Sequence, residues 1–97
     1  MLKFNSYTQK KLERIFTDLE YIIRFEKGNF QAGYCLVENK KIVVINRFFD
    51  TEAKINCLVD ILLKLEVDEQ KLQPKNAEYY RKLKRLAEKQ EEVGSNP

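Results

Sequence analysis

Two adjacent runs of β-branched and aromatic residues occupy the middle of the chain, between Asn29 and Phe49. Such residues favour a pleated, half-buried surface, so the runs predict two β-strands, over residues 30–38 and 41–46. Asn39 and Lys40 lie between the strands and predict a tight hairpin turn, because asparagine tolerates a positive φ. The cross-strand pairs predicted from this turn are Val37–Ile42, Leu36–Val43, Cys35–Val44 and Tyr34–Ile45. Both faces of the hairpin are then apolar, and each needs a covering layer.

A helix and a third strand are predicted ahead of the hairpin. Ser6, followed three residues later by Gln9, fits a capping box and predicts the helix start. The apolar stripe of this helix follows helical spacing and comprises Leu12, Ile15, Phe16 and Leu19. Residues 21–26 alternate apolar and charged side chains and predict a short edge strand, although the first helix running on through Ile23 is the alternative. A turn at residues 27–29 would connect this strand to the hairpin.

Two further helices are predicted after the hairpin. Residues 51–65 carry a broad apolar arc at helical spacing, and Asp50 or Thr51 suits the N-cap position. Residues 75–90 carry a narrower stripe, and Pro74 suits the first turn of that helix. Residues 91–97 predict a flexible C-terminal tail.

Together these elements predict one α+β domain over residues 1–90, in the order α-β-β-β-α-α. The expected sheet is a three-stranded antiparallel meander, with the first helix and the 51–65 helix packed on one face. The other face must be covered by the C-terminal helix or by a second copy of the chain, so a homodimer is expected as one solution.

The absence of histidine excludes several kinds of active site. No Ser-His-Asp or Cys-His arrangement and no histidine-containing zinc site can form, and two cysteines cannot supply a Cys₄ zinc site. We therefore expect no metal, no cofactor and no enzymatic activity. No apolar run approaches the ~20 residues of a membrane span, and two isolated cysteines in apolar segments suit a reducing compartment, so a cytoplasmic protein without membrane contact is expected.

Positive charge is concentrated near the C-terminus. Residues 1–70 hold eleven basic and eleven acidic side chains, whereas residues 71–90 hold seven basic and two acidic ones. The candidate nucleic-acid contacts in this segment are Arg81, Lys82, Lys84 and Arg85. With Tyr79 and Tyr80 beside them, such a helix would lie along phosphates and stack a base. The alternative is an ordinary amphipathic helix with a lysine-rich solvent face.

Three other side chains have a candidate role. Phe48 and Phe49 are more aromatic surface than one loop needs to bury, so they are candidate partner contacts. Cys35 is a candidate reactive thiol, but its neighbours carry no charge that would activate it, and packing in the core is the favoured interpretation.

The central run also carries a resemblance. The resemblance lies in a Gly-x-Phe-x-x-Gly-Tyr-Cys strand, a second strand ending in Ile-Asn and a leucine-rich helix. Over residues 12–66 the chain resembles in these features a family of small uncharacterised bacterial proteins. The matching positions are Gly28, Phe30, Gly33, Tyr34, Cys35, Ile45 and Asn46. This family implies no particular function. The layout is also faintly similar to the front half of minimal zinc-metallopeptidase (zincin-like) domains, but residues 57–65 lack the His-Glu-x-x-His motif, so that resemblance implies only an inactive scaffold.

The sequence therefore supports three functional hypotheses. The leading one is a non-enzymatic interaction or accessory protein that acts as a homodimer or through a docked protein partner. The first alternative is a nucleic-acid-binding module that uses the 75–90 helix. The second is a catalytically inactive zincin-like scaffold.

Overall fold

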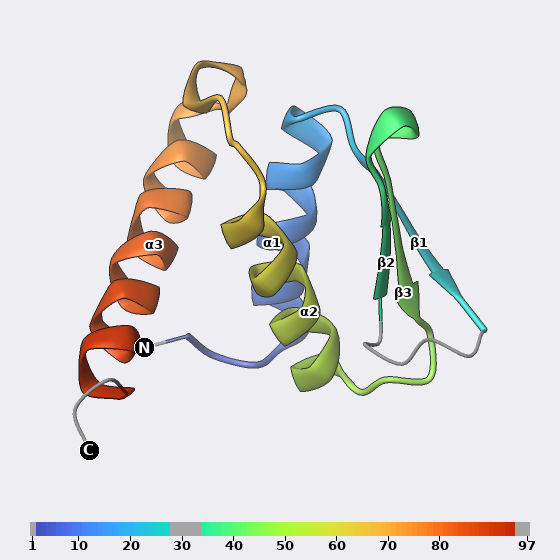
Figure 1. The fold of residues 1–97 in the computed structure, drawn as a ribbon, viewed down its shortest axis with the longest axis horizontal. Coiled ribbons are helices and arrows are strands. Elements are labelled where there is room, and N and C mark those ends of the chain that lie inside the picture. Colours follow the sequence, from blue (N-terminus) through green and yellow to red (C-terminus); the bar gives the residue numbers. More distant parts are fainter. Residues whose placement is uncertain (1, 28–33, 95–97) are drawn as a thin grey trace.

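A computed structural model gives the backbone of residues 2–27 and 34–94, and it describes the side chains of residues 2–27 and 39–88. The described residues form an α+β fold of three helices and a small sheet (Figure 1). Its elements are α1 (Ser6–Asp18), β1 (Ile22–Glu26), β2 (Tyr34–Val37), β3 (Ile42–Asn46), α2 (Thr51–Lys64) and α3 (Pro74–Gly94). Short 3₁₀ turns lie at Glu38–Lys40 and Glu69–Lys71.

The sheet is mixed, and its strand order is β1-β3-β2. β2 and β3 form the antiparallel hairpin, but β1 runs parallel to β3 on the opposite side. The predicted antiparallel meander is therefore wrong. A meander would place β2 in the centre of the sheet, whereas β3 is the central strand in the structure. Burial alternates along β3, and Val43 and Ile45 lie in the core. The predicted edge position of β1 is confirmed, but the predicted turn at residues 27–29 lies partly outside the described residues.

The predicted hairpin register is confirmed, because Val37 pairs with Ile42 and Tyr34 pairs with Ile45. The turn itself differs from the predicted two-residue turn. Residues 38–40 form a 3₁₀ turn, and the left-handed conformation falls on Lys41, with φ 52°. This conformation costs a non-glycine residue roughly 1 kcal/mol. Lys41 is held there because its carbonyl accepts a hydrogen bond from the Ile22 N–H at 2.8 Å, which ties the turn to β1.

Side chains at the helix starts fix where two of the helices begin. Asn5, one residue before the predicted Ser6, is the N-cap of α1, and its Oδ1 accepts from Thr8 N at 2.9 Å. Asp50, one of the two predicted candidates, caps α2, and its Oδ1 accepts from Ala53 N at 2.8 Å. Each cap satisfies a backbone donor that has no partner within its helix. α3 runs four residues beyond Gln90, into the segment that was predicted to be a tail.

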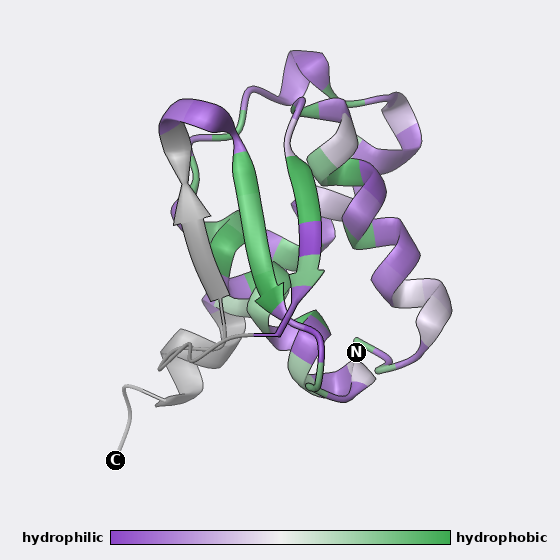
Figure 2. Cartoon of the chain, turned by 90° about the vertical axis from the view of Figure 1, so that its right-hand side faces the viewer, coloured by the Kyte–Doolittle hydropathy of each residue, from purple (hydrophilic) through white to green (hydrophobic). Residues whose placement is uncertain are grey.

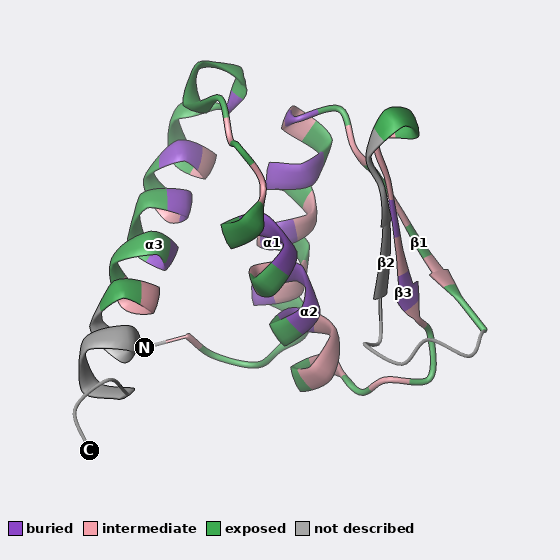
Figure 3. Ribbon diagram, in the orientation of Figure 1, coloured by how far each residue is buried: buried purple, intermediate pink, exposed green. Residues whose placement is uncertain are grey.

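α1 and α2 cover one face of the sheet, and α3 packs against α1 on the side away from the strands (Figure 1). Figure 3 shows that buried positions line the inner sides of the helices and the centre of β3. The fully buried side chains are Leu12, Ile15, Phe16, Val43, Ile45, Ile55, Leu58 and Leu62. The apolar stripes predicted for the first two helices therefore form the core.

The opposite face of the sheet has no helix over it in the described part of the chain. Figure 2 looks onto this face, where most of β3 is hydrophobic. Ile22 on β1 is 56% exposed, and its neighbours on β3, Ile42 and Val44, are half-buried. α3 does not cover these side chains, because it lies on the far side of α1. We name the exposed surface formed by Ile22, Arg24, Glu26, Ile42 and Val44 the open face.

Among the residues that the structure describes, no helix is both long enough and apolar enough to span a membrane.

The core predicts a contrast between two leucines of α2. Leu58 is fully buried, whereas Leu63 is 39% exposed. Replacing Leu58 by alanine should lower the free energy of unfolding by about 2–5 kcal/mol, because it removes buried methyl groups and leaves a cavity. The matched Leu63→Ala change should cost no more than about 0.5 kcal/mol. Urea unfolding followed by circular dichroism measures both, and equal losses would contradict this assignment of the core.

Candidate functional site

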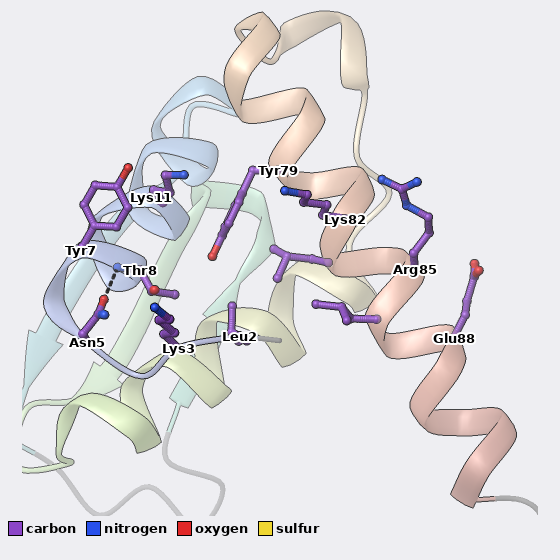
Figure 4. A pocket seen from close by; sticks show the side chains of 12 residues that line it. Leu2, Lys3, Asn5, Tyr7, Thr8, Lys11, Tyr79, Lys82, Arg85 and Glu88 are labelled. Carbon is purple, nitrogen blue, oxygen red and sulfur yellow. Dashed lines mark hydrogen bonds between the residues drawn. The ribbon is translucent and has the colours of Figure 1, made fainter.

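A groove lies between α1 and α3, and the N-terminal residues Leu2, Lys3 and Asn5 border it. Its volume is about 1000 Å³. Figure 4 shows Tyr79 projecting from α3 toward α1, with Tyr7 and Lys11 on the facing helix. The groove is lined by Leu2, Lys3, Asn5, Tyr7, Thr8, Lys11, Tyr79, Lys82, Leu83, Arg85, Leu86 and Glu88.

A long-range polar contact fixes α3 beside α1. Asp18, the last residue of α1, accepts hydrogen bonds from Gln73 N at 2.9 Å and from Asn76 Nδ2 at 2.8 Å. These donors belong to the start of α3, where a carboxylate also interacts favourably with the helix dipole. Further along α3, Tyr80 and Leu83 are buried against the core. The polar contact and the apolar contacts together set the spacing of the two helices that wall the groove.

Lys11 lies between two aromatic rings. Its Nζ is 5.0 Å from the centroid of the Tyr7 ring and 4.8 Å from that of Tyr79. The negative faces of aromatic rings attract an ammonium group by about 0.5–1 kcal/mol each at exposed sites. The two rings therefore hold the charge of Lys11 at the groove without neutralising it.

Tyr79 forms part of the groove wall. It is half-buried and lines the groove together with Thr8, which is only 6% exposed. Burial raises the pKa of Tyr79 above its ordinary value of 10.0, the polar Thr8 side chain lowers it, and the nearby Tyr7 raises it further. The net result is a raised pKa, so Tyr79 stays neutral at physiological pH.

The lining of the groove is strongly basic. It includes four cationic side chains and one acidic one, Glu88. Within residues 2–27 and 39–88, none of the four cations forms an ion pair; they are Lys3, Lys11, Lys82 and Arg85. A second hollow, of about 820 Å³, shares Tyr7, Lys11, Tyr79 and Lys82 with the groove and continues it toward the start of α3.

The structure divides the four predicted nucleic-acid contacts into two pairs. Lys82 and Arg85 line the groove. Arg81 instead donates to Glu69 Oε1 at 2.8 Å, and the Nζ of Lys84 is 5.6 Å from the centroid of the Tyr80 ring. Two of the four predicted cations, Arg81 and Lys84, therefore lie outside the groove lining.

The tyrosines of the site also differ from those predicted. Tyr80 is only 4% exposed and belongs to the core, whereas Tyr79 does face the groove. Tyr7, which is 65% exposed, was not predicted at all. The sequence feature that could have identified Tyr7 is its position one helical turn before Lys11, outside the apolar stripe of α1.

The two candidate partner-contact phenylalanines have different environments. Phe48 is 67% exposed, and the guanidinium of Arg47 lies 5.5 Å from the centroid of its ring. Phe49 is half-buried and packs against the core. Asn46 closes this loop, because its Oδ1 accepts from Phe48 N at 3.0 Å. The two rings do not make one equally exposed patch.

The cysteines offer no activated thiol where they are described. The side chain of Cys35 lies outside the described residues. Cys57 is buried on α2, and its pKa is raised by burial and by the negative charge of Asp60. Both effects disfavour the thiolate, which is the nucleophilic form. The described side chains also include no group of three or more Cys, Asp or Glu residues placed to hold a metal ion.

Comparison with family models, with curated proteins and with solved structures finds no match for this chain. The groove must therefore be interpreted from its own chemistry. It combines basic side chains, exposed aromatic surface and a concave shape, which suits the binding of an anionic ligand.

The raised pKa of Tyr79 predicts a pH-dependent stability. The folded state disfavours ionisation of this phenol, so its contribution is fully present below the ordinary pKa of 10.0 and is lost as pH rises through the raised pKa of the folded protein. The difference in Tm between the wild type and Tyr79→Phe should be constant from about pH 7 to 9. Above pH 10.0 the wild type should lose Tm faster than the variant. A difference that stays constant throughout would contradict the assigned environment of Tyr79.

Proposed function

We propose that this protein is a non-enzymatic nucleic-acid-binding protein and that the groove between α1 and α3 is its binding site. The observation that carries the proposal is the convergence of Lys3, Lys11, Lys82 and Arg85 on one concave, tyrosine-lined surface without acidic partners among the described residues. Protein cations that contact phosphates displace the counterions of nucleic acid, and this release drives association.

The rest of the chain favours the groove over other surfaces for this role. The chain as a whole carries a net charge of only +3, so a general attraction to polyanions would be weak. The groove concentrates four positive charges against one negative charge. Some described cations elsewhere are paired, as Arg24 is with Glu26 at 3.9 Å and Lys41 is with Glu20 at 3.5 Å. The groove therefore gathers positive charge on a concave surface.

The division of the basic residues on α3 supplies a matched test. Lys82→Gln/Arg85→Gln removes two cations from the groove, and Arg81→Gln/Lys84→Gln removes the same charge from the neighbouring positions of the same helix. With a fluorescent single-stranded oligonucleotide, the wild type should show a slope of log K against log salt of roughly −3, from four phosphate contacts. For the groove variant, the slope should be about 1.4 units less steep, and the affinity for the oligonucleotide should be roughly 10- to 30-fold lower at 0.1 M salt.

The control variant should bind nearly as well as the wild type, because Arg81 and Lys84 do not line the groove and Arg81 is already paired with Glu69. Fluorescence anisotropy between 50 and 200 mM salt distinguishes these results. Equal weakening of both variants would show that the net charge of α3, rather than the groove, attracts the probe. An absence of binding by the wild type at low salt would reject the proposal.

Self-association through the open face is a second candidate role, and the exposure of Ile22 favours it. Arg24 and Glu26 neutralise each other there, so two copies would meet without the repulsion that their net positive charges cause elsewhere. Packing a second sheet on this face would cover the apolar side chains that α3 leaves exposed. A second copy of the chain is therefore the expected occupant.

The dimer is tested by one substitution on the open face and one control. Ile22→Glu places a charge among apolar side chains and should shift the protein to the monomer in sedimentation equilibrium. Leu63→Glu introduces the same charge at a partly exposed position of α2, away from the open face, and should leave the dimer intact. If the wild type remains monomeric at several hundred micromolar, its dimer dissociation constant is on the order of 10³ times higher than that of a stable dimer. That result would reject this role.

A further inference from the structure

We infer that Tyr7 is a stacking platform for an unpaired base and that Lys11 binds the phosphate next to that base, so the ligand of the groove is single-stranded nucleic acid. This inference rests on the proposed function and specifies the form of the ligand. It starts from Tyr7, which lies in the first turn of α1 and is 65% exposed although it borders the groove.

The neighbours of Tyr7 match the chemistry of one nucleotide unit. The Nζ of Lys11 is 5.0 Å from the centroid of the Tyr7 ring, and Lys82 lines the groove from the opposite helix. A base stacked on the exposed part of the ring would therefore have the Lys11 ammonium near its phosphate, and Lys82 would face the strand from the other wall of the groove. An aromatic ring beside cations is also how proteins bind single strands without sequence preference, because every base has a π face.

The second ring contact gives Lys11 a fixed position. The centroid of the Tyr79 ring lies 4.8 Å from the same Nζ, and Tyr79 is half-buried in the groove wall. Its ring is therefore less accessible to a base than that of Tyr7. We assign Tyr79 as a positioning residue, which holds the ammonium of Lys11 in the groove, and Tyr7 as the residue that touches the base.

The need for an accessible base determines the form of the nucleic acid. In a duplex each base is already stacked between its neighbours, so its face is not free to meet a side chain. A single strand exposes base faces and bends into a concave site. The cations alone would attract single and double strands alike, whereas stacking on Tyr7 adds affinity only for unpaired bases.

The test compares two probes that have the same number of phosphates. One is an oligothymidylate, and the other is the same strand with abasic positions. Wild-type protein should bind the base-bearing strand about 5- to 100-fold more tightly than the abasic one, from stacking of one base. Tyr7→Leu should bring the ratio of the two affinities close to one. Tyr7→Phe should keep the wild-type ratio, because phenylalanine retains the aromatic face.

Phe4→Leu is the matched control. Phe4 is also an exposed aromatic residue near the N-terminus, at 45% exposure, but it is not part of the groove lining. Its replacement should leave the ratio unchanged. A circular dichroism melt of each variant confirms that the fold persists, which is expected because both side chains lie outside the core.

The outcomes separate this inference from the proposed function. If Lys82→Gln/Arg85→Gln weakens binding of both probes while Tyr7→Leu leaves their ratio unchanged, the stacking inference is overturned and the nucleic-acid function stands. If wild type binds the two probes equally, stacking is likewise overturned. If wild type binds neither probe, the proposed function fails and the inference fails with it.

Discussion

The packing of α1 between α2 and α3 is the interaction on which the rest of the structure depends. Leu12, Ile15 and Phe16 are fully buried, and they join α1 to α2 and to the sheet. At its end, Asp18 joins the same helix to the start of α3. α1 thus supplies both the centre of the core and one wall of the groove. A change in its tilt would disturb stability and the candidate site together.

The helices and the hairpin could be predicted from the sequence, because their signals are local. The spacing of Ile55, Leu58 and Leu62 specifies a buried helix face, and the residues around Asn39 specify which strand positions pair. The order of the strands could not be predicted in this way. Alternation shows which side chains share a face but not which strand lies next to which, and the usual preference for sequential neighbours favoured the meander.

The candidate site could be predicted only in part, because it combines two helices that are distant in sequence. The basic character of α3 was visible, but the sequence does not show that Arg81 meets Glu69 while Lys82 faces α1. Tyr7 was missed because a single tyrosine on the polar side of a helix is unremarkable until Lys11 and Tyr79 are placed beside it. Predicting such a site requires the contacts between elements.

The parallel pairing of β1 with β3 has a consequence for the order in which the sheet forms. Ile22 pairs with Ile42, whereas the hairpin partners Val37 and Ile42 are close in sequence. Local hairpins close within microseconds, and contacts between distant residues wait for a longer loop to close. β3 is therefore expected to pair with β2 before it pairs with β1. On the ribosome, the first strand to be synthesised would be the last to enter the sheet.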